Sequence, residues 1–246
     1  MSKKDFIEKR VEGRRQLLQK IVEVFKTLKP VAIHQFGSGG RGYKDEFSDI
    51  DVWITFRDEN IDRALGELSR IFSDIAPVVV KHHSKTWSPV DGSSNSVVHE
   101  TKYGLFVVDY YVSKFSETIL KKDSMILFGD DSLKKGEWKL NRHVDEKMHD
   151  SHTLRKDIDL LLDLIFVSYK GIIRKWENNE FIEIVKLVHK KFRERYKGKL
   201  RARRVSLSFN SNYRLLSDLY KISNKRQRRA VNKIRKYAHQ IEELYT

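Results

Sequence analysis

Two aspartates separated by one residue, Asp49 and Asp51, form the pattern in this sequence with the most specific chemistry. In the stretch that follows Asp49, residues 50–56, every second residue is apolar, and this period predicts a strand with one buried face. Residues two apart on a strand project from the same face, so the two carboxylates would lie together. A divalent cation relieves the repulsion between such carboxylates, and Mg²⁺ prefers oxygen ligands of this kind together with substrate phosphates. The pair therefore predicts a magnesium-dependent site.

A glycine-rich turn, residues 37–42, precedes the two aspartates. Its Gly-x-Gly-x-x-Gly string matches the dinucleotide-binding fingerprint, but that fingerprint needs a helix opening from the glycines and an acidic residue about 20 residues further on. Here a polar connector leads into a strand instead, and the kinase signatures that accompany a glycine loop are missing. Gly37 lets the backbone approach a phosphate closely, Ser38 can hydrogen-bond to it, and Arg41 is a nearby cation. We therefore expect the turn to bind a triphosphate.

A third carboxylate would complete a two-metal site, and Asp109 is the best candidate for it. Asp109 lies within an apolar, strand-like stretch, residues 103–112. A charge in such a stretch is costly unless it is paired or bound to a metal, which favours a functional role. Glu100 is the alternative third carboxylate.

Periodicity predicts an α+β fold, with a small mixed sheet flanked by helices and followed by an all-helical domain. We expect the catalytic domain to span residues 1–125 and a basic helical domain to span residues 126–246. Helices are predicted at residues 5–28, 60–74, 153–177, 179–197 and 212–245. Strands are predicted at residues 31–36, 49–56, 76–80 and 103–112, a loop at residues 88–96, and no strand beyond residue 113.

The charge of the chain is concentrated near its C-terminus. The 246 residues carry a formal net charge of +15, and residues 181–246, with 19 Lys and Arg against 5 acidic residues, account for +14 of it. Such a segment favours polyanionic partners. The sequence has no cysteine, which suits a reducing compartment, and no apolar run long enough to span a bilayer. We expect a cytoplasmic protein without membrane contact.

Residues 33–56 resemble the signature of the DNA polymerase β-type nucleotidyltransferase superfamily. The family pattern is an apolar residue, Gly-Ser, a short spacer and Asp-x-Asp, with a third Asp or Glu on a later strand. The residues that carry the resemblance are His34, Gln35, Phe36, Gly37, Ser38, Arg41, Gly42, Phe47, Ser48, Asp49, Ile50, Asp51 and Val52. The helical second half, including residues 126–130, more loosely resembles antibiotic nucleotidyltransferases of the aminoglycoside and lincosamide kind.

The resemblance implies an enzyme that moves a nucleoside monophosphate, expected to be AMP, from an NTP to a hydroxyl acceptor and releases pyrophosphate. Its catalytic residues and the ligands of two Mg²⁺ ions would be Asp49, Asp51 and Asp109. The NTP would be bound by Gly37, Ser38, Arg41 and Ser48.

The expected acceptor is a small molecule such as an antibiotic, because the chain has room for one catalytic domain and one helical domain that closes over the acceptor. The basic C-terminal third disfavours a polycationic aminoglycoside but not a neutral acceptor. One alternative is an RNA nucleotidyltransferase, and another is an antitoxin-like protein of this fold that binds a partner. In the RNA enzyme, the phosphate backbone would be held by Lys197, Lys199, Arg201, Arg203, Arg204, Lys225, Arg226, Arg228, Arg229, Lys233, Arg235 and Lys236.

Overall fold

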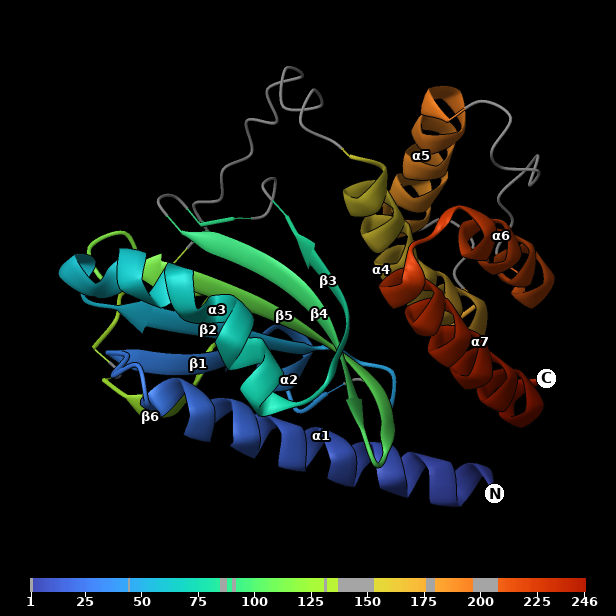
Figure 1. Ribbon diagram of the computed structural model, residues 1–246. Helices are drawn as coiled ribbons and strands as arrows, with labels where there is room; N and C mark the ends of the chain where they lie inside the picture. The colour runs from blue at the N-terminus through green and yellow to red at the C-terminus, as the bar shows by residue number, and fades with distance from the viewer. Residues whose placement is uncertain are drawn as a thin grey trace. The chain divides into compact units, whose positions relative to one another are not determined.

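Two compact units make up the chain (Figure 1). The structure is a computed structural model that describes residues 2–43, 45–84, 88–89, 92–130, 132–136, 153–175, 180–196 and 208–246. The first unit comprises residues 1–78 and 83–149, and the second comprises residues 79–82 and 150–246. This division falls later than the predicted boundary after residue 125, because the strand β6 (Met125–Gly129) belongs to the sheet.

A six-stranded mixed sheet carries the predicted site residues. Its strands are β1 (Ala32–Phe36), β2 (Ile50–Phe56), β3 (Val78–His83), β4 (Ser93–Thr101), β5 (Gly104–Lys114) and β6. They lie in the order β3-β4-β5-β2-β1-β6. The strands β2 and β5 run parallel, while β1 is antiparallel to both β2 and β6, and β4 is antiparallel to β5. The mixed sheet with flanking helices, followed by C-terminal helices, confirms the predicted fold class.

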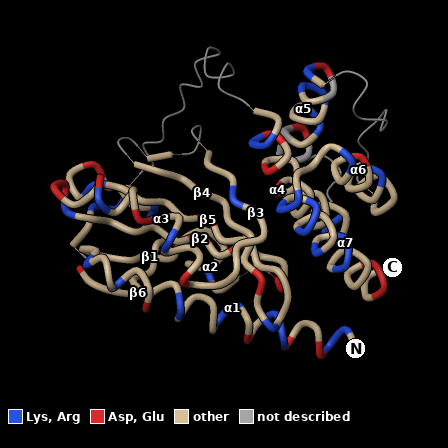
Figure 2. The backbone as a smooth tube through the Cα atoms, viewed as in Figure 1, with Lys and Arg blue, Asp and Glu red and all other residues tan. Residues whose placement is uncertain are grey.

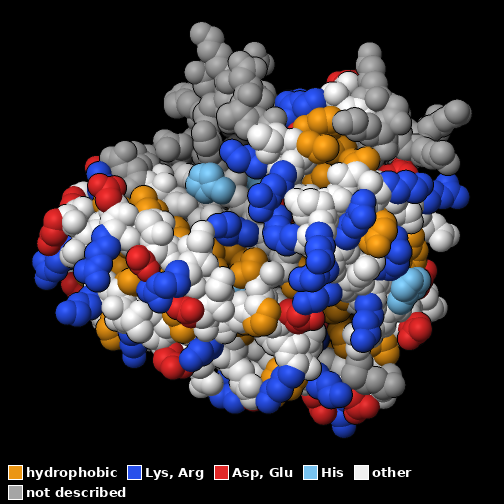
Figure 3. All heavy atoms as spheres, in the orientation of Figure 1, with side chains coloured by type: hydrophobic (Ala, Val, Ile, Leu, Met, Phe, Trp, Pro, Cys, Tyr) orange, Lys and Arg blue, Asp and Glu red, His pale blue; other side chains and the backbone are white. Residues whose placement is uncertain are grey.

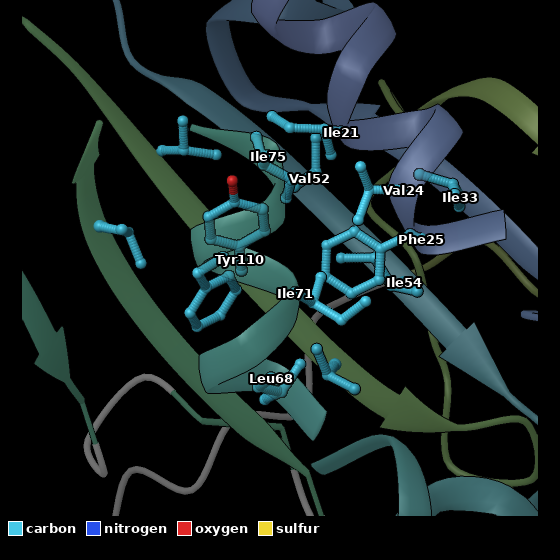
Figure 4. Packing of buried hydrophobic residues seen from close by; sticks show 14 of the residues in the cluster. Ile21, Val24, Phe25, Ile33, Val52, Ile54, Leu68, Ile71, Ile75 and Tyr110 are labelled. Atoms are coloured by element: carbon cyan, nitrogen blue, oxygen red, sulfur yellow. The ribbon is translucent and has the colours of Figure 1, made fainter. Parts of the chain in front are cut away.

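Two helices, α1 (Lys3–Lys26) and α3 (Ile61–Ile75), cover one face of this sheet and form the main core with it. Figure 4 shows side chains of α1, such as Phe25, packing with Ile71 of α3 and Tyr110 of β5. A capping box stabilises the start of α1, since Ser2 and Asp5 each accept a hydrogen bond from the other's backbone N–H. The opposite face carries Asp51 of β2 and Asp109 of β5, together with a second buried cluster that includes Trp53 and Tyr111.

Several elements differ from the sequence-based predictions. The glycine turn contains a short helix, α2 (Gly37–Gly40), and the 3-10 helix η1 (Asp58–Asn60) leads into α3. The predicted loop at residues 88–96 was wrong in its second part, because β4 begins at Ser93. The absence of strands beyond residue 113 was also wrong, because β5 extends to Lys114 and β6 follows it.

The helical second unit contains α4 (Leu154–Ile173), α5 (Glu180–Arg195), α6 (Phe209–Ile222) and α7 (Lys225–Tyr245). The single helix predicted at residues 212–245 is thus two helices, because Ser223 is extended and Asn224 caps α7. Buried acids join the helices: Asp157 accepts hydrogen bonds from Arg195 and Tyr196 at 2.9 and 2.8 Å. None of the helices in the described ranges is long and apolar enough to cross a membrane.

Candidate active site

Gly37 and Ser38, the Gly-Ser segment, directly follow the last residue of β1. Phe36 is the last residue of β1, and Gly37 then turns the chain into α2 with a φ of +63°, a conformation that glycine adopts readily and other residues adopt at a cost. A Cβ atom added to Gly37 would lie 2.5 Å from Oδ2 of Asp51. The glycine therefore leaves the space that the Asp51 carboxylate occupies.

Two of the predicted catalytic carboxylates are neighbours across parallel strands. Asp51 of β2 and Asp109 of β5 are register partners. Adjacent strands lie about 4.8 Å apart, so directly paired residues project side by side from the same face. This face is the one opposite α1 and α3, because the intervening residues Val52 and Tyr110 belong to the core with those helices. Both aspartates are only partly buried.

Asp49 lies one residue before β2 and is also partly buried. Tyr111 connects Asp49 with the other two carboxylates, because its side chain lies on the same face of the sheet as Asp51 and Asp109. Burial raises the pKa of Tyr111 well above its usual value, and the charges of Asp109, Asp51 and Asp49 act in the same direction. All three predicted carboxylates thus lie within electrostatic reach of one tyrosine.

The register separates Asp109 from the alternative third carboxylate, Glu100. Asp109 pairs with Ser96 of β4, whereas Glu100 pairs with Leu105, close to the hairpin that joins β4 and β5. Leu105 lies four residues before Asp109 on β5, so Glu100 is farther from Asp51 along the sheet than Asp109 is. The geometry favours Asp109 as the partner of Asp51.

The donor set suits Mg²⁺, which is commonly held by one or two carboxylates together with substrate phosphates. Asp51 and Asp109 supply adjacent hard oxygen donors, and the glycine beside Asp51 keeps that space free of side-chain carbon. In the part of the chain that the structure describes, no three Asp, Glu or His side chains are grouped as a complete metal site. The phosphates of a nucleotide would have to complete the coordination.

The other predicted nucleotide-binding residues differ in their surroundings. Ser38 is half-buried on α2, and its carbonyl oxygen accepts a hydrogen bond from the backbone N–H of Tyr43 at 2.5 Å. Arg41 is exposed and forms an ion pair with Asp123. Ser48 is buried, and its hydroxyl accepts a hydrogen bond from the backbone N–H of Asp45 at 3.3 Å.

Two buried arginines of α1 approach the connector between the Gly-Ser segment and β2, and sequence reasoning missed both. Arg10 donates to the carbonyl oxygens of Glu46 and Leu105 at 3.2 and 2.5 Å. Arg14 donates to the carbonyl oxygen of Asp45 at 2.8 Å, and its guanidinium carbon lies 4.0 Å from the ring centroid of Tyr43. The signal was present in the sequence, because both arginines fall on the helical stripe that the apolar residues of α1 define.

The comparisons with known proteins agree with this geometry. Residues 18–102 match the family model of the nucleotidyltransferase domain. The match begins within α1 and ends at the turn between β4 and β5, so it includes Asp49 and Asp51 but not Asp109. The chain therefore contains a nucleotidyltransferase domain, which confirms the predicted superfamily and indicates an enzyme of NTP-dependent nucleotidyl transfer. A search of curated proteins found no match.

Proposed function

We propose that this protein transfers a nucleoside monophosphate, preferably AMP, from an NTP to a hydroxyl group of an acceptor in a Mg²⁺-dependent reaction. The observation that carries the proposal is the side-by-side placement of Asp51 and Asp109, with Gly37 packed against the Asp51 carboxylate. A phosphate-binding turn next to paired carboxylates is what nucleotidyl transfer requires, because the triphosphate and the metal ligands must meet at one point.

In this proposal Asp49, Asp51 and Asp109 are the metal ligands. Two bound Mg²⁺ ions would neutralise the triphosphate and lower the pKa of the acceptor hydroxyl. The acceptor oxygen forms a bond to the α-phosphorus, the bond from that phosphorus to the β-phosphate oxygen breaks, and pyrophosphate leaves. Asp109 accepts the proton of the acceptor hydroxyl.

The nucleotide-binding residues contribute in different ways. Gly37 and Ser38 contact the triphosphate through the backbone and the Ser38 hydroxyl. Arg41 is exposed, so a phosphate can compete with Asp123 for its guanidinium group. Ser48 contributes indirectly: its hydrogen bond with Asp45 stabilises the connector between the Gly-Ser segment and β2.

A neutral or singly charged small molecule, such as an antibiotic, is the proposed acceptor. The chain contains a compact helical unit in addition to a minimal catalytic unit, and this supports the assignment because the helical unit is a second body that can bind an acceptor. The formal charge of +14 in residues 181–246 disfavours a polycationic acceptor through repulsion. A cysteine-free chain is compatible with the cytoplasm as the place of the reaction.

A nucleic acid is the second candidate acceptor, and a specific feature of α7 favours it. Lys225, Arg229, Lys233 and Lys236 are exposed and recur every three or four residues, so they form one stripe along the helix (Figure 2). Figure 3 shows Lys and Arg side chains gathered over this helical unit. Five other predicted cations, Lys197, Lys199, Arg201, Arg203 and Arg204, lie outside the described residues.

The direct test is pyrophosphate release from each of the four NTPs with Mg²⁺, measured with a panel of labelled-nucleotide acceptors that includes neutral antibiotics and short RNA. The variants Asp51→Asn and Asp109→Asn should each lose activity by at least about a hundredfold, because each removes a charge that stabilises the transition state.

Glu100→Gln is the matched control, since it removes a carboxylate of β4 whose register partner, Leu105, lies four residues before Asp109 on β5. This variant should keep near-normal activity. Undiminished pyrophosphate release in an Asp49→Ala, Asp51→Ala double variant would refute the proposed function.

A further inference from the structure

Arg14 of α1 is a buried cation with an incomplete set of hydrogen bonds. Its side chain is 4% exposed, and its Nη2 atom donates to the carbonyl oxygen of Asp45 at 2.8 Å. Its Nε atom, also buried, has no hydrogen-bond partner among the described residues. Burying a guanidinium group in this way is costly, and the charge needs compensation from nearby groups.

Part of that compensation comes from the candidate active site. The groups that stabilise the positive charge of Arg14 include Tyr43, Asp45 and the carboxylate of Asp49. Arginine keeps its proton under all ordinary conditions, so its charge is a permanent feature beside Asp49. Arg10, the other buried arginine of α1, lies over the ring of Phe106 at 3.6 Å and reaches Glu46 and Leu105 instead.

The contact between Arg14 and Tyr43 extends to the Gly-Ser segment. Tyr43 holds a left-handed backbone conformation with a φ of +61°, which is strained for a residue with a Cβ atom. Its hydroxyl group accepts a hydrogen bond from the side-chain amide of Gln35 in β1. The Gln35 side chain in turn fills the space beside Gly39, where an added Cβ atom would approach to 2.4 Å. The contacts thus run from α1 through the connector to β1 and α2.

We propose that Arg14 is a positioning residue for nucleotidyl transfer: it holds Tyr43 and residues 45–48 of the connector against α1 and thereby fixes Asp49 relative to Asp51. Arg14 makes two contacts with the connector. Its guanidinium group lies over the Tyr43 ring, and one of its N–H groups donates a hydrogen bond to the Asp45 carbonyl oxygen. The inference rests on the proposed function only in assigning Asp49 to the reaction. The ordering of the connector is a property of the folded protein itself.

The kinetic expectation separates positioning from nucleotide binding. Gly37 and Ser38 follow β1 directly, and neither is hydrogen-bonded to Arg14 in the described part of the chain, so in Arg14→Met the KM for NTP should rise by a much smaller factor than kcat falls. The kcat value should fall by about a hundredfold, because a displacement of about 1 Å in a catalytic group has effects of that size. Leu17→Ala is the matched control, since it weakens the packing of α1 in the hydrophobic core.

Arg14→Lys distinguishes geometry from charge. Lysine keeps the positive charge but has neither the planar face nor the forked donors of arginine, so it should not restore kcat. Normal kcat in Arg14→Lys would overturn the positioning role, because charge alone would then be sufficient. Equal losses in Arg14→Met and Leu17→Ala would overturn it as well, since both would then reflect loosened packing of α1.

Amide hydrogen exchange without nucleotide supplies a readout that does not depend on activity. The backbone N–H groups of Phe47 and Ser48 donate to the side chain and carbonyl of Asp45, at 3.0 and 3.2 Å, so their exchange reports on the connector. Arg14→Met should accelerate exchange at both positions, and Leu17→Ala should not. Unchanged exchange would overturn the inference even if the wild-type protein is active.

The two proposals can fail separately. A wild-type protein that releases no pyrophosphate contradicts the proposed function, while the exchange measurement still decides whether Arg14 orders the connector. Should Arg14→Met not fold, Tyr43→Leu serves in its place, because it removes the ring under the guanidinium and the hydroxyl bonded to Gln35. Normal kcat and normal exchange in Tyr43→Leu would overturn the inference.

Discussion

Two features favour glycine at position 37: the positive φ of its backbone and the Asp51 carboxylate beside it. The φ of +63° is accessible to glycine at little cost, while an L-residue there loses roughly 1–2 kcal/mol. The Asp51 carboxylate occupies the place where a Cβ atom would be, so a side chain at this position would have to displace it. The residue therefore acts on Asp51 as well as on the turn.

We expect Gly37→Ala to reduce activity by about a hundredfold, through displacement of the Asp51 carboxylate. The control is Gly42→Ala, because Gly42 also has a positive φ, of +88°, but an added Cβ atom would meet nothing within 4 Å. Both variants should lower the free energy of unfolding by roughly 1–2 kcal/mol. Pyrophosphate release and urea denaturation would be compared in parallel, and an equal loss of activity in both variants would contradict the role of Gly37 beside Asp51.

The sequence indicates candidate site residues one by one, but it does not show which residues lie next to them in space. Asp49 and Asp51 were identifiable because a period of two places them on one face of a strand. The pairing of Asp51 with Asp109 was beyond the sequence, since it depends on the register of two parallel strands that are far apart in the chain. Arg14 was missed because a charged residue in a helix normally faces solvent, and only the phase of the apolar stripe shows that this one does not.

Among the elements, the sequence missed the first half of β4 and the whole of β6, two strands that carry no alternating apolar pattern of their own. The first half of β4, Ser93 to Ser96, is polar but mostly buried, and the strand lies between β3 and β5 in the sheet. The edge strand β6 is short and mostly half-exposed, and Met125 is 47% exposed, so no apolar period marks it. The helices α1 and α3 were predictable because their own apolar stripes determine which side is buried.

A buried hydrogen bond between His99 of β4 and Tyr110 of β5 makes the stability of the first unit dependent on pH. The Nδ1 atom of His99 lies 3.1 Å from the carbonyl oxygen of Ala76, an acceptor only, so Nδ1 carries the proton. Nε2 then accepts a hydrogen bond from the Tyr110 hydroxyl at 2.9 Å. Burial lowers the pKa of His99 to about 4, from an ordinary value near 6.5. The folded protein therefore holds this histidine neutral where the unfolded chain would protonate it.

The sign of the effect follows from proton counting. Between about pH 6.5 and pH 4 the unfolded chain binds more protons at this site, so stability falls as the pH decreases through this window. The loss should approach about 3 kcal/mol at pH 4. Urea denaturation at several pH values should show this decline, and His99→Gln should flatten it. His239→Gln, at an exposed position, is the control, and an unchanged slope in His99→Gln would contradict the assignment.

On the scale of the whole molecule, catalytic carboxylates and positive charge are separated along the chain. The predicted site lies in the first unit, whereas the last 66 residues carry +14 of the total +15. Within α7, some cations are engaged in the unit itself: Arg226 bonds to Asp159, and Arg228 bonds to the carbonyl oxygen of Tyr220. The exposed stripe on the same helix is what a polyanion would contact.

If nucleic acid binds along α7, neutralising its stripe should reduce both affinity and salt dependence. The variant Lys225→Gln, Arg229→Gln, Lys236→Gln removes three cations from that stripe, and each phosphate contact to a single strand contributes about 0.7 to the slope of log K against log salt. The slope for short RNA should therefore decrease by about 2 in gel-shift titrations, while pyrophosphate release with a small-molecule acceptor stays unchanged. The matched control, Lys4→Gln, Lys9→Gln, Arg63→Gln, removes the same charge from exposed positions of α1 and α3. An equal decrease in both triple variants would mean that RNA responds to net charge alone, and would exclude α7 as a specific binding surface.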